Sequence, residues 1–327
     1  MALSSSPRLA RFLRLSLSSP QLWLLLRIYI GIRDAAPSLA PPALALWIIP
    51  DQYGKSPVVK KYKNKEIERA TNGFSMVIKT GPDGTTYKAQ FENGLVCDVK
   101  RAKSSEQRKD DFLKEVQLLG RLHHRHVVRL LGFSDEVNRF LVFDHMENGS
   151  LMECLHDPLR SPLSWSIRLK IAIDVAAALE YLYYFCDPPL FHVSVNTKCV
   201  MLDADYTAKL SDVGLLNDNN SNFTSASCSR ENIEQSRKEL VFQYGVLILE
   251  LVTGQSLSGE KELVRWVQAS GFHSSLHNMV DADLGNTYNS KELHSLLVAA
   301  RLCTKSGNDS FVSVPLVHRY LQKRLTS

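Results

Sequence analysis

Histidines are concentrated at one point of the sequence, where His123, His124 and His126 lie close together. Imidazole nitrogens are common ligands of transition metals, so a cluster of this kind could bind a metal ion. A turn whose histidines serve packing or simply face solvent is the alternative interpretation. The spacing alone leaves both open.

The cysteines do not suggest metal or disulfide chemistry. There is no Cys-x-x-Cys pair, which argues against a zinc site and against a disulfide framework, and favours a reducing compartment. The six cysteines are scattered along the chain: Cys97, Cys154, Cys186, Cys199, Cys228 and Cys303.

The net charge of +5 comes from the beginning of the chain. Residues 1–33 contain five arginines and no acidic residue, and without these five the 39 Lys and Arg become 34, equal to the 34 Asp and Glu. A nucleic-acid-binding domain carries its basic residues on the folded part. We therefore expect no nucleic-acid partner.

Residues 1–57 are expected to form a basic, then apolar leader outside the main domain. Leu9, Leu13 and Leu17 recur at helical spacing among arginines. Such a segment can lie on an anionic membrane surface, here through residues 1–49, or act as an organelle transit peptide. Its apolar stretches are interrupted and shorter than the roughly 20 residues of a spanning helix. A disordered tail is the alternative.

The rest of the chain, residues 58–327, has a strand-rich first half and a helix-rich second half. This order predicts an α+β fold with two lobes, about 58–145 and about 146–327, and a cleft between them. The expected strands are 74–78, 85–91, 95–101, 127–133 and 139–144, and the expected helices are 62–70, 106–122, 167–184 and 240–253.

Long phrases within this region resemble the kinase domain of plant receptor-like kinases of the Pelle-like group. The resemblance covers about 60–327 and implies the two-lobed protein-kinase fold. It also places the three histidines in a turn of the family, which favours a structural role for them. The phrases are Glu66-Ile-Glu-Arg-Ala-Thr-Asn-Gly-Phe74, Leu122-His-His-Arg-His-Val-Val-Arg-Leu-Leu-Gly132, Met146-Glu-Asn-Gly-Ser-Leu151, Ile171-Ala-Ile-Asp-Val-Ala176 and Leu249-Glu-Leu-Val-Thr-Gly254.

The glycine-rich loop that covers phosphates in this family corresponds here to residues 79–86. Gly81 and Gly84 remain, but Lys79 replaces the first glycine, Pro82 lacks a backbone N–H and Asp83 adds negative charge. Backbone N–H groups are what such a loop offers a phosphate, so we expect weak binding. An ordinary tight turn is the alternative.

The resemblance also identifies remnants of a nucleotide site. Lys100 is expected to pair with Glu115, either as in the family or as a purely structural salt bridge. The segment from Asp144 to Met146 is expected to be the hinge, which either meets adenine or simply connects the lobes. Asp98 falls in the apolar roof over adenine, where a carboxylate is costly to desolvate and repels polyphosphate. Gly81, Gly84, Lys100, Glu115, Asp144 and Met146 are therefore nucleotide-binding positions in vestigial form.

The residues expected to form the catalytic loop lack the groups that phosphate transfer needs. By the resemblance, Ser194 stands in place of the base aspartate, Asn196 in place of the lysine that steadies the phosphoryl group, and Cys199 in place of a magnesium-binding asparagine. A serine hydroxyl is too weak a base at neutral pH, and a thiol is a poor ligand for magnesium. No catalytic residue of this loop is intact.

The segment that follows is also altered. Asp212 could still bind one Mg²⁺, or merely cap a turn. The activation segment is short, with residues 217–229 expected to be a flexible loop and Ser227 and Cys228 at the Pro-Glu positions. Leu240 replaces the aspartate that begins the core helix, and residues 307–311 lack the arginine that pairs with the Pro-Glu carboxylate.

We therefore expect a receptor-like pseudokinase that acts as a signalling scaffold or a modulator of active receptor kinases. No cofactor is expected, with ATP and Mg²⁺ weak at most. The resemblance implies other receptor-like kinases or signalling proteins as partners, at the cytoplasmic side of the plasma membrane or in the cytoplasm, with organelle targeting by the leader as an alternative. A weakly active or ATP-binding Ser/Thr kinase is the second hypothesis, and a damaged gene copy without stable product is the third.

Overall fold

The structure is a computed structural model, and the chain divides into two units, Met1–Gly54 and Lys55–Ser327. The expectations for the leader, for residues 82–83, for the 217–229 loop and for residues 307–311 lie outside the described residues. The structure describes residues 59–81, 84–102, 109–186, 190, 193–213, 230–255, 260–269, 279–285, 287–305 and 312–325.

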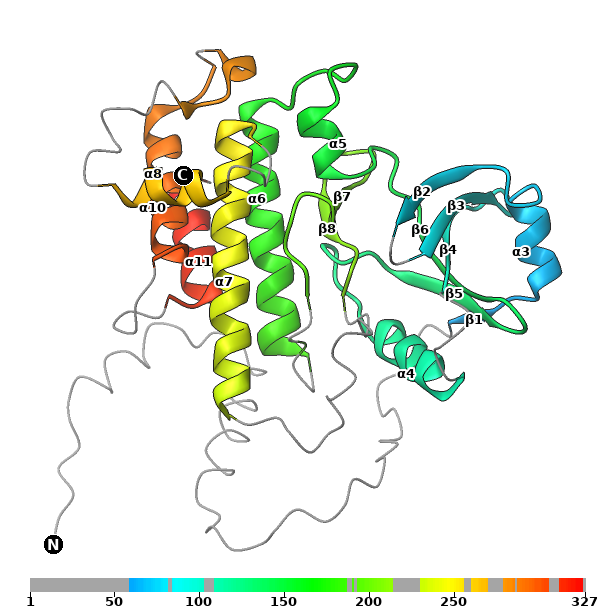
Figure 1. The fold of residues 1–327 in the computed structure, drawn as a ribbon. Coiled ribbons are helices and arrows are strands. Elements are labelled where there is room, and N and C mark those ends of the chain that lie inside the picture. The colour runs from blue at the N-terminus through cyan, green and yellow to red at the C-terminus, as the bar shows by residue number, and fades with distance from the viewer. Residues whose placement is uncertain are drawn as a thin grey trace, which may run out of the picture. The chain divides into compact units, whose positions relative to one another are not determined.

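The first lobe is a twisted sheet with two helices beside it (Figure 1). Its strands run in the order β1-β5-β6-β4-β3-β2, and all neighbours are antiparallel except β1 and β5. The elements are β1 (Lys60–Lys61), α3 (Asn64–Ala70), β2 (Val77–Gly81), β3 (Gly84–Gln90), β4 (Val96–Arg101), α4 (Lys109–Gly120), β5 (Leu130–Asp135) and β6 (Arg139–Asp144).

The second lobe is helical, with one two-stranded sheet near the first lobe (Figure 1). Together, the two lobes confirm the predicted α+β, two-lobed kinase fold. The elements are α5 (Leu151–His156), α6 (Trp165–Glu180), a π-helical turn (Tyr181–Phe185), β7 (Val200–Leu202), β8 (Ala208–Leu210), α7 (Arg230–Thr253), α8 (Glu260–Gln268), a 3₁₀ turn (Ala282–Leu284), α10 (Ser290–Cys303) and α11 (Val314–Leu325).

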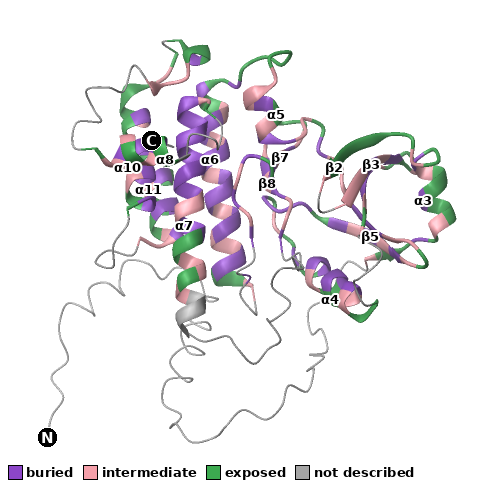
Figure 2. Ribbon diagram, in the orientation of Figure 1, coloured by how far each residue is buried: buried purple, intermediate pink, exposed green. Residues whose placement is uncertain are grey.

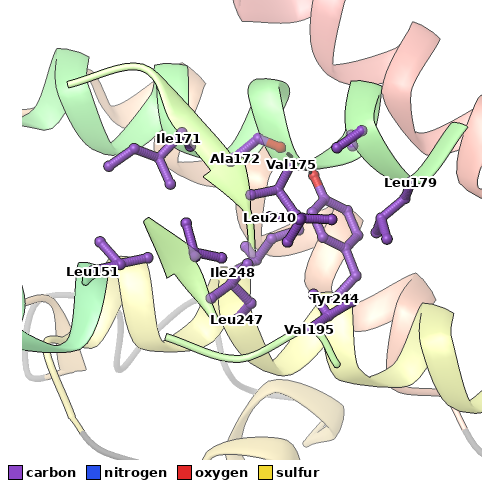
Figure 3. Close-up of a cluster of buried hydrophobic side chains, with 14 of the residues drawn as sticks. Leu151, Ile171, Ala172, Val175, Leu179, Val195, Leu210, Tyr244, Leu247 and Ile248 are labelled. Atoms are coloured by element: carbon purple, nitrogen blue, oxygen red, sulfur yellow. Dashed lines mark hydrogen bonds between the residues drawn. The ribbon is translucent and has the colours of Figure 1, made fainter. Parts of the chain in front are cut away.

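Helices α6 and α7 form the centre of this lobe and are buried over most of their described surface (Figure 2). Their apolar side chains pack around Tyr244, whose hydroxyl donates a hydrogen bond to the backbone carbonyl of Ala172 at 2.7 Å (Figure 3). A buried tyrosine needs such a partner, because an unpaired hydroxyl in an apolar core is costly. This core fixes the floor of the cleft described below.

Several element boundaries differ from the sequence-based expectation, most of all at the start of α7. Helix α7 begins at Arg230, so Leu240, expected at its start, lies well inside it. No glycine or proline occurs from Arg230 to Leu240, and the helix can therefore continue upstream through this stretch. Lys60 and Lys61, in turn, join the sheet edge as β1, a pairing made by backbone groups that two lysines do not reveal.

Among the described helices, none is long and apolar enough to cross a membrane.

Candidate functional site

A cavity of about 1090 Å³ lies between the sheet of the first lobe and the helices of the second. Its walls come from β2, β3, β4, the hinge, the segment 193–199, β7 and α7. Nearly all predicted site residues line it, although they are far apart in sequence. They are Gly81, Gly84, Lys100, Asp144, Met146, Ser194, Asn196, Cys199 and Asp212.

The two remaining glycines of the phosphate-covering loop close a β-hairpin. Gly81 ends β2 and pairs with Gly84, which begins β3. Gly84 has φ +112°, and a Cβ atom there would lie 2.4 Å from the backbone oxygen of Arg101. The hairpin itself therefore requires glycine at this position, so Gly84 is explained without any bound phosphate.

Lys100 has a different acidic partner from the one we expected. Its ammonium nitrogen lies 3.7 Å from Oδ1 of Asp212, and both side chains are only partly exposed. Glu115 is 6% exposed on α4 and is not among the residues that line the cavity. Among the described residues, the ion pair of Lys100 thus joins β4 to the segment that follows β8.

The second oxygen of Asp212 is also engaged. The thiol of Cys199 donates to Asp212 Oδ2 at 3.1 Å. Burial raises the pKa of Cys199 to about 12, with the charge of Asp212 adding to the effect, so the thiol stays protonated at neutral pH. A protonated thiol does not ligate Mg²⁺, and within the described residues no cluster of three His, Cys, Asp or Glu could hold a metal.

Hydrogen bonds fix the conformation of the segment that was expected to be the catalytic loop. The side-chain oxygen of Asn196 accepts the backbone N–H groups of Lys198 and Cys199 at 3.0 and 3.2 Å. The N–H of Val195 donates to Oε1 of Gln243 on α7 at 3.1 Å. Ser194 lines the cavity with a hydroxyl in place of a carboxylate. His192, which begins this loop, lies outside the described residues.

The hinge holds a contact that we did not anticipate. Asp98 on β4 is 8% exposed, and its Oδ1 accepts a hydrogen bond from Nδ1 of His145 at 2.6 Å. Burial raises the pKa of Asp98 above its usual value, and the contact with His145 offsets this only in part. A carboxylate in an otherwise apolar strand signals that some partner is needed, but the sequence does not say which.

The N-terminal half of α7 supplies the far wall of the cavity. Gln235, Ser236, Glu239, Leu240 and Gln243 all line it. The sequence did not point to Gln235, Ser236 and Glu239, because the helix was expected to begin only at Leu240.

The three histidines that could have formed a metal site have separate protein partners instead. The ring of His124 stacks on Tyr181 with centroids 4.6 Å apart. His126 is buried, with Nδ1 3.0 Å from the carbonyl of Ala208 and Nε2 3.5 Å from a carboxylate oxygen of Asp174. The Nδ1 atom of His123 lies 2.8 Å from the carbonyl of its neighbour Leu122. These contacts are those of a packed turn.

Comparison with protein families and known structures agrees with this geometry. A family model described as protein tyrosine and serine/threonine kinase matches residues 73–269, more than half of the chain. A "Probable receptor-like protein kinase" of Arabidopsis thaliana is 39% identical over 288 residues, which are 81% of this chain and 43% of the relative. The chain thus spans under half of that relative's length.

Two solved structures have a similar fold. The pseudokinase domain of BIR2, an immune regulator of the RLK/Pelle family, gives a TM-score of 0.68 at 27% identity, covering 81% of this chain and 85% of that one. The pseudokinase DRIK1, drought responsive inactive kinase 1, gives a TM-score of 0.69 at 22% identity, covering 83% of this chain and 98% of that one. The second likeness concerns the fold alone.

Proposed function

The chain belongs to the protein tyrosine and serine/threonine kinase family, with plant receptor-like kinases among its relatives, and we propose that it is a member that transfers no phosphate. Its kinase-shaped domain would act through contacts with other proteins. The fold itself does not decide this, because function depends on the residues of the site.

One observation carries the proposal: Ser194 lines the cavity. The resemblance to kinases matches this residue to the aspartate that acts as the base. A hydroxyl has almost no basicity at neutral pH and cannot accept the proton of a substrate hydroxyl. Both oxygens of Asp212, the remaining candidate metal ligand, already have protein partners in Lys100 and Cys199.

The likeness to the BIR2 pseudokinase domain supports a non-catalytic role, since that protein is described as an immune regulator. We extend this to a signalling scaffold or modulator that contacts active receptor-like kinases or other signalling proteins. In this proposal the domain works in the cytoplasm or at the cytoplasmic side of the plasma membrane, with the leader as a contact to the membrane surface.

A phosphotransfer assay tests the proposal directly. The purified chain is incubated with radiolabelled ATP and a generic protein substrate, once with Mg²⁺ and once with Mn²⁺. We expect no incorporation above that of the Lys100→Ala variant, prepared in the same way to control for contaminating kinases. Activity that Lys100→Ala abolishes would overturn the proposal.

A nucleotide-binding switch is the second candidate, favoured by the presence of Lys100 and Asp212 in the same cavity. Thermal unfolding with ATP distinguishes the two, because a ligand stabilises the folded state by RT ln(1 + [L]/Kd). We expect no increase in the unfolding temperature at about millimolar ATP, a concentration that would give about 1.4 kcal/mol for a Kd of about 0.1 mM. A clear increase would favour the switch.

A further inference from the structure

The hinge end of the cavity is the part of the structure that the loss of catalysis does not explain. A missing base prevents phosphate transfer but leaves nucleotide binding untouched. The contact between Asp98 and His145 lies in the hinge, where the lobes join.

Asp98 reaches the cavity from the sheet, and His145 reaches Asp98 from the hinge. Asp98 pairs across the strands with Phe143 of β6, and the chain continues from there through Asp144 to His145. The short Asp98–His145 hydrogen bond of 2.6 Å therefore ties β4 to the residue that follows β6. Both side chains are mostly buried, at 12% and 16% exposed. The contact is part of the cavity wall.

Asp98 is a wall residue of the cavity, and so is Met146, which follows His145 in the chain. A flat ring that entered the cleft beside the hinge would therefore meet the buried carboxylate of Asp98.

We propose that Asp98, fixed by His145, is an internal occupant of the hinge end of the cleft and excludes a purine ring from it. The inference rests on the proposed function and deepens it, because it concerns the same cleft. A purine ring would have to displace the Asp98 carboxylate from its charge-assisted hydrogen bond with His145 and leave this buried group less well paired, and both effects oppose binding.

Adenosine is the probe that isolates this end of the cleft. It has no phosphate, so the altered glycine turn and the Lys100–Asp212 pair play no part in its binding. Isothermal titration calorimetry measures its dissociation constant for the full chain and for Asp98→Ala. We expect no measurable binding by the wild type and a gain of about tenfold or more in the variant.

Glu153→Gln is the control. Glu153 lines the same cavity and carries the same charge, but its carboxylate accepts the backbone N–H of Ser150 at 3.0 Å and has no contact with His145. We expect no gain in adenosine binding from Glu153→Gln. An equal gain in both variants would overturn the proposal, because removal of negative charge in general would then explain it.

Asp98→Ala leaves His145 without its partner and could impair folding. The double variant Asp98→Ala/His145→Phe avoids this, since replacing both partners by apolar groups can be nearly neutral. Thermal unfolding checks both variants before titration. Folded Asp98→Ala or double-variant protein that binds adenosine no better than wild type would overturn the proposal, as would tight binding by the wild type. Phosphotransfer by the wild type would refute the proposed function only.

Discussion

At the scale of single residues, His126 and Asp174 form a pair of buried titratable groups. The pair of His126 and Asp174 joins the turn after α4 to α6 and β8, with Asp174 also accepting the N–H of Ala208 at 3.1 Å. Burial raises the pKa of Asp174 from 3.8 to about 6 and lowers that of His126 from 6.5 to about 4. Each group alone would make stability depend on pH.

The two dependences oppose each other. Between about pH 4 and 6 the folded state holds a proton on Asp174 that the unfolded state has released, so stability falls as pH rises. For His126 the unfolded state holds the extra proton between about pH 4 and 6.5, so stability rises with pH. Each effect amounts to about 3 kcal/mol, so they nearly cancel.

Asp174→Asn should therefore reveal the contribution of His126. We expect the free energy of unfolding of this variant, relative to wild type, to rise by about 3 kcal/mol from pH 4 to pH 6.5. Urea unfolding at several pH values measures it. His126→Gln should show the opposite slope, and parallel curves for wild type and both variants would contradict the explanation.

A second residue-scale prediction concerns the buried ion pair of Arg168 and Asp281. Their nearest charged atoms are 2.6 Å apart, and the guanidinium, 2% exposed, also donates to the carbonyls of Leu163 and Leu251. We expect Arg168→Met to lower the free energy of unfolding by about 3–5 kcal/mol, because Asp281 would remain as a poorly paired charge. Urea denaturation measures the loss.

The surface pair of Arg69 and Glu92 provides the control. Its atoms are 2.9 Å apart, but the side chains are 70% and 85% exposed, so water and salt screen the attraction. We expect Arg69→Met to change stability by less than about 1 kcal/mol. Equal losses in the two methionine variants would show that burial does not set the strength of these pairs.

At the scale of elements, the end of α7 depends on a glycine. Gly254 follows the helix with φ +64°, and a Cβ atom there would lie 2.4 Å from a carboxylate oxygen of Asp281. Gly73 has nearly the same backbone angle, φ +66°, but no atom within 4 Å of its Cβ position. The two glycines share the left-handed conformation and differ only in their surroundings.

We expect alanine at either glycine to cost about 1–2 kcal/mol of left-handed strain. Gly254→Ala should cost about 1–3 kcal/mol more, because Asp281 must shift and its ion pair with Arg168 is disturbed. Thermal or urea unfolding of the two variants measures the difference. Equal destabilisation would mean that Asp281 can move away freely.

The N-terminal part of α7 forms part of the cleft wall. Its first turns bring Gln235, Ser236 and Glu239 to the wall of the cavity. The carboxamide of Gln243 holds the former catalytic loop by donating to Glu239 at 3.0 Å and accepting from Val195 at 3.1 Å. The helix that forms the core of the lobe is thus also part of the candidate site.

At the scale of the whole molecule, the chain divides into the units Met1–Gly54 and Lys55–Ser327, and the second unit contains the hydrophobic clusters of the described residues. Since apolar burial is the main stabilising term of folding, we expect residues 58–327 to fold without residues 1–57. The midpoint of thermal unfolding of residues 58–327 should lie within about 2 °C of the midpoint of the full chain. A difference of that size corresponds to a change in stability on the order of 1 kcal/mol or less. A lower midpoint would show that the leader contributes to the domain.

The sequence by itself determined the two-lobed fold and the residue type at each candidate site position. Strand-rich and helix-rich halves indicate two lobes, and the residue type at Ser194 excludes a base there whatever the surroundings, since a hydroxyl is not a base at neutral pH. These conclusions depend on local pattern and on the chemistry of one side chain.

Only the tertiary structure decided which groups are partners. Asp98 contacts His145, and Asp212 contacts both Lys100 and Cys199, although these partners are far apart in sequence. The first turns of α7 line the cavity, which the expected start of this helix at Leu240 did not indicate. Pairing of buried polar groups is settled by distances across lobes and strands, which no local pattern contains. The sequence shows that Asp98 is costly in its place, and the fold shows what offsets that cost.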